Sequence, residues 1–161
     1  MTKVAVYPGT FDPLTLGHVD LIERSAEIFE TVILGVAEAT PKETLFSLDD
    51  RVAMAREVVG DFDNVRVEPF NALLIDYVRS RAARVIIRGL RAYSDFEYEF
   101  QMALTNRKLA PEIETLFMMP KEIHSYVSSS TVRQVARLGG DTSLFVPETV
   151  DRFIRRKNGK R

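Results

Sequence analysis

The chain has 161 residues, of which 45% are apolar and 28% are charged, and its formal net charge is −1. This composition indicates a folded globular protein with one domain over residues 1–161, and it gives no sign of a surface for nucleic acid or anionic membranes. No apolar run approaches the roughly 20 residues that cross a bilayer, and the lack of cysteine excludes disulfides, thiolate metal sites and cysteine nucleophiles. The chain begins without the layout of a signal peptide, so we expect a cytoplasmic location.

Five β-branched or aromatic runs predict β-strands. In chain order they span residues 4–7, 32–36, 65–68, 85–87 and 115–118. Stretches with helical periodicity lie between runs of this kind, so strand and helix alternate along the chain. Such alternation favours an α/β fold, and we expect a Rossmann-like, doubly wound, five-stranded parallel sheet with helices on both faces.

Apolar residues at helical spacing predict four helices. These cover residues 19–29, 52–59, 96 to the break at 110–111, and 132–138. Ser47 and Asp50 resemble a capping box before the second helix, and Gly139-Gly140 is typical of a helix end after the fourth. From about residue 155 the chain is strongly basic, and we expect a solvated, frayed tail there.

The first polar cluster follows the first predicted strand. It reads Gly9-Thr10-Phe11-Asp12-Pro13 and continues as Thr15-Leu16-Gly17-His18. Gly9 and Pro13 favour a tight turn, and Gly17 permits a close backbone approach. His18 then falls in the first turn of the next helix, where exposed amides and the helix dipole attract anions. The alternative is a polar cap residue, but His18 is one of only two histidines and lies in a Thr-x-Gly-His frame, which favours a functional role.

The second cluster, Arg88-Gly89-Leu90-Arg91, follows the fourth predicted strand. Guanidinium groups match phosphate with paired donors, and a glycine lets a ligand approach the backbone. The alternative is a surface ion pair with the acidic stretch at residues 95–99. The position directly after an apolar strand favours ligand binding.

The third cluster, Ser128-Ser129-Ser130, precedes the fourth predicted helix. A serine run is usually a flexible spacer, but before an amphipathic helix it indicates an N-cap and first turn, whose hydroxyls and amides bind phosphate oxygens. Two further residues are ambiguous by themselves. Lys42 follows the second predicted strand and could bind a ligand, but most exposed lysines only increase solubility. Leu74 would ordinarily belong to the core.

All three clusters follow short apolar runs, and loops at the carboxyl ends of parallel strands converge on one crevice of an open α/β sheet. Glycine, histidine, arginine and serine together are the residues that a nucleotide's phosphate chain requires. The sequence therefore predicts a nucleotide site built from segments that are far apart in the chain.

These motifs resemble those of the nucleotidylyltransferase superfamily: Thr-x-Gly-His at residues 15–18, Arg-Gly-Leu-Arg at 88–91 and Val-Ser-Ser-Ser at 127–130. Together with Tyr-Pro-Gly-Thr-Phe-Asp-Pro at 7–13 and Asp-Phe-Glu-Tyr-Glu at 95–99, they are similar to bacterial phosphopantetheine adenylyltransferase over residues 4 to about 147. The Arg-Thr-x-Gly motif of related cytidylyltransferases is absent. The resemblance implies a nucleotidyltransferase of coenzyme A biosynthesis, which transfers the adenylyl group of ATP to 4'-phosphopantetheine and gives dephospho-coenzyme A and pyrophosphate.

The same resemblance implies roles for individual residues. His18, Lys42 and Arg88 would be catalytic, and 4'-phosphopantetheine would be held by Thr10, Lys42, Leu74 and Arg88. The residues that would bind ATP are Thr10, Phe11, His18, Gly89, Leu90, Arg91, Glu99, His124, Ser125, Tyr126, Val127, Ser128, Ser129 and Ser130. His124 departs from the family, whose members commonly have tryptophan or tyrosine there.

The resemblance also implies Mg²⁺ as a cofactor, held by phosphate oxygens and water rather than by side chains, and a homohexameric assembly. Two other functions remain open. Another small-molecule adenylyltransferase, such as one acting on nicotinamide mononucleotide, would need a pyridine pocket, whereas Lys42, Leu74 and Arg88 suit a phosphate with an apolar arm. A non-catalytic nucleotide-binding module would tolerate the loss of His18 or Lys42, yet both are present.

Overall fold

A computed structural model describes residues 3–38, 43–91 and 93–159, and it shows one five-stranded sheet in which every pair of neighbouring strands is parallel. The strands are β1 (Val4–Gly9), β2 (Thr31–Ala37), β3 (Val65–Phe70), β4 (Val85–Gly89) and β5 (Glu114–Met118). Their order across the sheet is β3-β2-β1-β4-β5. All five predicted strands and the parallel sheet are therefore confirmed.

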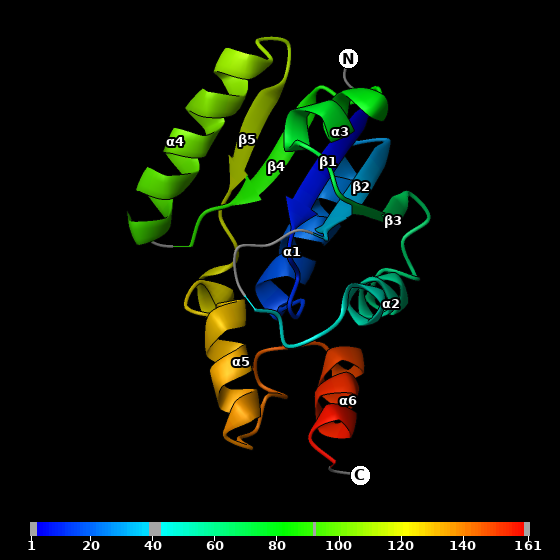
Figure 1. The fold of residues 1–161 in the computed structure, drawn as a ribbon, viewed down its shortest axis with the longest axis vertical. Coiled ribbons are helices and arrows are strands. Elements are labelled where there is room, and N and C mark those ends of the chain that lie inside the picture. The colour runs from blue at the N-terminus through cyan, green and yellow to red at the C-terminus, as the bar shows by residue number, and fades with distance from the viewer. Residues whose placement is uncertain (1–2, 39–42, 92, 160–161) are drawn as a thin grey trace.

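Successive strands are added on one side of β1 up to β3 and on its other side from β4 onward, so the strand order reverses at β1. β1 pairs with β2 on one side and with β4 on the other, so that Val6 lies between Ile33 and Ile86. In a doubly wound sheet a crevice opens at such a point, beyond the carboxyl ends of the two strands. Figure 1 shows the arrowheads of β1 and β4 pointing to the same end of the sheet, with two helices beyond it.

Helices cover both faces of the sheet. They are α1 (Leu16–Ile28), α2 (Leu48–Val58), α3 (Leu74–Ser80), α4 (Tyr93–Leu109), α5 (Ser129–Arg137) and α6 (Glu148–Lys157), with a 3-10 turn at Glu122–His124. Side chains alternate across a strand. In β1, Ala5 and Tyr7 pack into a core shared with α1, α2, α5 and α6, whereas Val6 packs into a second core with α3. The predicted cover on both faces is confirmed.

The four predicted helices correspond to α1, α2, α4 and α5. The Ser47 side chain caps α2 by accepting the backbone N–H of Asp50, and Gly139, after the end of α5, has a φ of 74°, as expected of a C-cap glycine. Neither α3 nor α6 was predicted.

Residues 155–157 are exposed, as expected of a solvated tail, but they are not frayed, because they form the last turn of α6. Val150 and Ile154 are buried and hold this helix on the core, and Arg155 is paired with Asp151 one turn earlier. Val150 and Ile154 lie four residues apart among polar and charged neighbours, so the apolar face of α6 was not recognised in the sequence.

The apolar stripe that predicted α4 does not face the core. Phe96, Phe100 and Leu104, one turn apart, are 48%, 47% and 49% exposed. The helix runs beside the edge strand β5 (Figure 1), so this face is open in the single chain. Within the ranges that the structure describes, no helix is both long and apolar enough to cross a membrane.

Candidate active site

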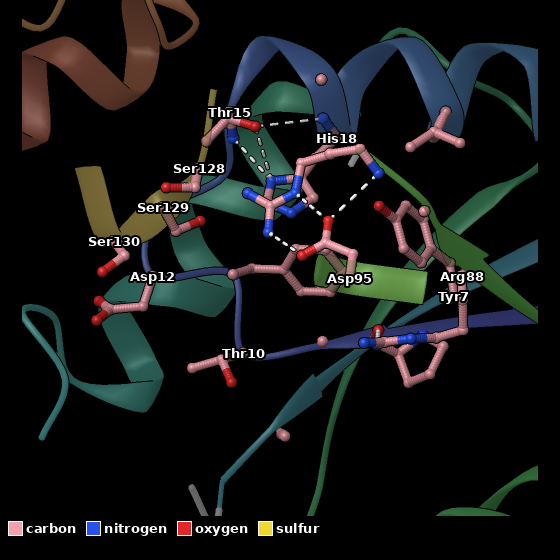
Figure 2. Close-up of a pocket in the computed structure, with 18 of the residues that line it drawn as sticks. Tyr7, Thr10, Asp12, Thr15, His18, Arg88, Asp95, Ser128, Ser129 and Ser130 are labelled. Atoms are coloured by element: carbon pink, nitrogen blue, oxygen red, sulfur yellow. Dashed lines mark hydrogen bonds and ion pairs between the residues drawn. The ribbon is translucent and has the colours of Figure 1, made fainter. Parts of the chain in front are cut away.

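A cavity of about 600 Å³ opens at the carboxyl ends of β1 and β4, the size of a small-molecule site. Twelve of the residues that the sequence predicts for the site line it, and they come from every predicted motif. They are Thr10, Phe11, His18, Leu74, Arg88, Gly89, Arg91, Glu99, Val127, Ser128, Ser129 and Ser130. In Figure 2 the three serines lie on one side of this space and Tyr7 and Arg88 on the other. Leu74 also packs against the core, which confirms its ordinary interpretation, and its role in binding a substrate stays a prediction.

Four predicted ATP ligands do not line the cavity: Leu90, His124, Ser125 and Tyr126. The Leu90 N–H is bonded to the carbonyl of Met118, and Tyr126 is 70% exposed. Lys42 lies outside the described residues.

His18 is fixed by the residue that caps its helix. The Thr15 side chain accepts the backbone N–H of His18, and the Thr15 backbone N–H donates to Nδ1 of the His18 ring over 2.9 Å. Because Nδ1 accepts a hydrogen bond, it carries no proton in the neutral ring. The proton of the neutral imidazole is therefore on Nε2, which makes that nitrogen a donor.

The surroundings of His18 keep its ring neutral. Burial, together with the charges of Arg91 and Arg88, lowers its pKa to about 3, from the ordinary value of 6.5. The ring of Phe11 packs edge-on against the imidazole with centroids 5.2 Å apart. The Phe11 ring also explains Gly9, since a Cβ there would lie 2.9 Å from it. The His18 ring is therefore uncharged at neutral pH, with its proton on Nε2.

This pKa makes a testable prediction. We expect the NMR signals of the His18 imidazole to show a neutral Nε2–H tautomer with no titration between pH 8 and about pH 5, because its pKa lies near 3. In the unfolded chain the same ring gains a proton below about pH 6.5, so the free energy of unfolding should fall as pH decreases from 6.5 toward 3. The signal is assigned by its absence in His18→Gln, and a midpoint above pH 6 would contradict the prediction.

Arg88 is held at the end of β4 by a paired ion contact. Its Nε and Nη2 donate to the two carboxylate oxygens of Glu99 over 2.8 and 2.5 Å, and Nη1 donates to the carbonyl of Pro8. Burial disfavours the charged guanidinium, but the hydrogen bonds and charge of Glu99 outweigh it and raise the pKa of Arg88. The guanidinium is therefore charged and fixed before any ligand arrives.

Arg91 is held in a similar way by Asp95, which lies one helical turn before Glu99 on α4. Its Nε donates to Asp95 over 3.0 Å, and its Nη1 donates to the carbonyl of Val127 over 3.2 Å. Asp95 and Glu99 are four residues apart on α4, so one face of this helix orients both arginines. The two interpretations of the second cluster are thus compatible, because the ion pairs with residues 95–99 lie in the cavity wall itself.

The serine cluster begins α5 as predicted. Ser128 is the N-cap and accepts the N–H of Thr131, while Ser129 donates its hydroxyl to the carbonyl of Pro13 in the β1–α1 loop. The N-termini of α1 and α5 therefore both adjoin the cavity, and each contributes backbone donors and a positive dipole end. A bound anion would be stabilised from two directions.

Several lining residues were missed by sequence reasoning. Tyr7, Thr15, Asp95 and Arg133 contribute to the wall, and Asp12 was quoted in the first motif without a role. The signal for Asp95 was present, since the 95–99 stretch was already recognised as a partner for the arginines. No comparable signal marks Arg133, whose place follows only from the packing of α5 on the β1–α1 loop.

The arrangement can bind a polyphosphate and stabilise charge that develops on it. The guanidinium groups of Arg88, Arg91 and Arg133, a neutral imidazole donor and two helix N-termini surround one space. The ring nitrogen Nδ1 of His18 is engaged by a backbone amide rather than by a carboxylate, so His18 is not set up as the base of a nucleophilic triad.

Comparisons with known proteins agree with this geometry. The family model described as cytidylyltransferase-like matches residues 6–135. A phosphopantetheine adenylyltransferase of Cupriavidus necator is 54% identical over 98% of both chains, and one of Nitratidesulfovibrio vulgaris is 56% identical over 98% of this chain and 84% of its own. Among solved structures, a bifunctional NMN adenylyltransferase/ADP ribose pyrophosphatase from Francisella tularensis superposes with a TM-score of 0.78. It is 16% identical, and the match covers 100% of this chain and 51% of that one, so it supports the fold alone.

Proposed function

Because the chain belongs to the phosphopantetheine adenylyltransferases, within the cytidylyltransferase-like family, we propose that it transfers the adenylyl group of ATP to 4'-phosphopantetheine. The products are dephospho-coenzyme A and pyrophosphate, and the reaction belongs to coenzyme A biosynthesis. The observation that carries the proposal is the convergence of His18, Arg88 and Arg91 on one cavity.

The reaction is a direct displacement at phosphorus. A phosphate oxygen of 4'-phosphopantetheine attacks the α-phosphorus of ATP, the bond from that phosphorus to the bridging oxygen breaks, and pyrophosphate leaves with the electron pair. No side chain becomes adenylylated. Catalysis then consists of positioning and charge stabilisation: Arg88 and Arg91 reduce the repulsion between two anionic substrates, and the Nε2–H of His18 donates to charge that develops in the transition state.

The two ends of the cavity suit the two substrates. Ala37, Phe70, Leu74 and Met102 contribute an apolar wall, and the Phe70 ring is held by stacking on Tyr77 with centroids 4.5 Å apart. This wall suits the pantetheine arm, which we place there with its phosphate toward Thr10 and Arg88. ATP occupies the side of His18, Gly89, Arg91 and residues 127–130.

One assay separates this function from its alternatives. Pyrophosphate release is measured with ATP and, in turn, 4'-phosphopantetheine, nicotinamide mononucleotide, nicotinate mononucleotide or no acceptor. We expect release only with 4'-phosphopantetheine. Release with a pyridine nucleotide instead would assign another adenylyltransferase activity, and ATP binding without release with any acceptor would indicate a binding module.

We also propose that Mg²⁺ enters with ATP. In the described parts of the chain no three acidic or histidine side chains cluster as a metal site, and the carboxylates of Asp95 and Glu99 are engaged by arginines. The oxygen atoms that remain as possible metal ligands, such as the hydroxyls of Thr10 and Ser130, are uncharged. They fit an ion that is held chiefly by phosphate oxygens and water. When bound, the ion would neutralise phosphate charge, which the four lining carboxylates otherwise repel.

This proposal predicts a metal requirement. We expect turnover to fall below detection in excess EDTA and to return with Mg²⁺ but not with Zn²⁺ at micromolar concentration. The control is addition of Ca²⁺, which restores the ATP–metal charge with a larger and looser coordination shell. Full turnover with metal-free ATP would contradict the prediction.

We further propose a cytoplasmic homo-oligomer, with the family's hexamer as the expected assembly. The exposed stripe of Phe96, Phe100 and Leu104 on α4 supports self-association, because single chains seldom leave such a face open to water. Sedimentation velocity measures the assembly directly. The cytoplasm supplies the ATP that the reaction consumes.

A further inference from the structure

Two buried charged side chains border the active site without belonging to the predicted catalytic set. Asp12, in the β1–α1 loop, and Arg51, on α2, are each 2% exposed. Charged groups are seldom buried to this extent unless they are paired or hydrogen-bonded. Their contacts therefore indicate what each of them holds in place.

The carboxylate of Asp12 binds the segment that leads into α2. Oδ2 accepts the backbone N–H of Leu45 over 2.7 Å, and Oδ1 accepts the backbone N–H of Phe46 over 2.9 Å. Both carboxylate oxygens are thus used by consecutive amides. Arg133 of α5 donates to the backbone carbonyl of Asp12 over 2.8 Å, and the same Nη1 lies 3.9 Å from Oδ2 of the carboxylate, so α5 also holds this residue.

Arg51 binds the place where the chain leaves β2. Its Nη1 donates to the carbonyl of Ala37, the last residue of β2, and to the carbonyl of Thr10 in the β1–α1 loop, each over 2.8 Å. Its Nε is buried and has no hydrogen-bond partner in the described part of the chain. Burial lowers the pKa of Arg51, and the nearby charge of Asp12 opposes this in part.

Asp12 and Arg51 bind the two ends of the connection between β2 and α2. The connection from β2 to α2 is tied at Ala37 by Arg51 and at Leu45 and Phe46 by Asp12, and both ties end on the β1–α1 loop at Thr10 or Asp12. Glu43 and Thr44, just before the second tie, line the cavity, as does Thr10. Figure 2 shows Thr10 and Asp12 on the same stretch of loop beside the cavity.

We propose that Asp12 and Arg51 are positioning residues for the adenylyl transfer, which fix both ends of the β2–α2 connection against the loop that carries Thr10. The proposal rests on the proposed function only for the identity of the substrates. A connection released at either end would let the cavity wall at Glu43 and Thr44 move relative to Thr10. Displacement of a positioning group by about 1 Å can cost on the order of 100-fold in rate.

Amide hydrogen exchange tests the anchor without any substrate. In the wild-type protein we expect the amides of Leu45 and Phe46 to be protected, although neither lies in a helix or strand. Asp12→Asn keeps the size of the side chain but offers only one acceptor for two N–H groups, so at least one of these amides should exchange ten-fold or more faster. Wild-type amides that exchange at the rate of an unstructured peptide would overturn the proposal.

Kinetics test whether the anchors matter for the reaction. Asp12→Asn and Arg51→Lys should each raise KM for 4'-phosphopantetheine about five-fold or more and lower kcat about ten-fold or more, because the wall on that substrate's side is released. KM for ATP should change less than KM for 4'-phosphopantetheine, since the hydrogen bonds of Ser129 and Arg133 to the carbonyls of Pro13 and Asp12 are kept, and Asp12→Asn removes only the 3.9 Å ion pair between Arg133 and Asp12. A merely structural role would lower the active fraction and leave both KM values unchanged, and that result would contradict the proposal.

Asp151→Asn is the matched control. Asp151 is 7% exposed and accepts from Thr142 and Arg155, so it is also a buried, doubly bonded carboxylate, but it does not line the cavity. We expect it to lower thermal stability with both KM values unchanged. If the wild-type protein shows no transfer to 4'-phosphopantetheine, the proposed function fails, whereas the exchange of Leu45 and Phe46 still decides whether Asp12 anchors the connection.

Discussion

His18→Ala is expected to fold like the wild type and to lose about 10²–10³ or more in kcat, the scale of removing one well-placed donor to a developing oxyanion. KM for either substrate should change little, because a donor that acts in the transition state contributes little to ground-state binding. The measurement is steady-state pyrophosphate release, with circular dichroism as the check on folding.

The magnitude follows from how His18 is held. Its ring is oriented by Thr15 through Nδ1 and by the edge of Phe11, so Nε2–H is aimed before the substrates bind. Alanine removes the donor but leaves a small cavity beside Phe11. His18→Gln is the matched variant, since a carboxamide N–H can reach toward the position of Nε2, and it should retain more activity than His18→Ala.

Two outcomes would contradict this role. Turnover of His18→Ala near that of the wild type would show that His18 is only a polar cap of α1. A loss of the same size that appears entirely in KM for ATP would show that His18 binds ATP in the ground state and does not act in the transition state.

Much of the fold could be predicted because its three central strands, β2, β1 and β4, are short apolar runs that are buried on both faces. Four inner residues of β1 and five of β2 are buried, so their sequences are apolar without alternation, as parallel strands require. The helix α3 could not be predicted in the same way. It has only seven residues, and its N-cap, Leu73, offers no side-chain hydrogen bond, so neither length nor capping marked it.

The site could be predicted as a set of motifs but not as a network. The carboxyl ends of β1 and β4 bring the first two clusters together, which strand order alone explains. The sequence left open an ion pair between the second cluster and residues 95–99, and the structure contains it, with Glu99 bound to Arg88 and Asp95 to Arg91. The contact of Asp12 with Leu45 spans 33 positions of the chain, and no local pattern marks it because it depends on tertiary packing.

Arg88 is the second residue for which we expect a large effect. Arg88→Met should lower kcat/KM for 4'-phosphopantetheine about 100-fold or more, because two charge-assisted hydrogen bonds to phosphate are each worth about 1.5–3 kcal/mol. The substitution also strands Glu99, whose side chain is 10% exposed. Breaking a fully buried pair costs about 3–5 kcal/mol, and we expect about 2 kcal/mol here because Arg88 itself is 31% exposed.

A double variant separates these two effects. Arg88→Met combined with Glu99→Gln removes the stranded charge, so thermal stability should largely return while kcat/KM stays low. Dephosphorylated pantetheine supplies the second control, because it lacks the group that Arg88 is proposed to hold. Because pantetheine has no phosphate oxygen to attack ATP, the two compounds are compared by their Kd values and not by turnover. The ratio of Kd for pantetheine to Kd for 4'-phosphopantetheine should be large in the wild type and at least about ten-fold smaller in both variants. If the double variant regains activity, or if the wild type binds pantetheine as tightly as its phosphate, then Arg88 serves only as the partner of Glu99 and does not hold the phosphate of the acceptor.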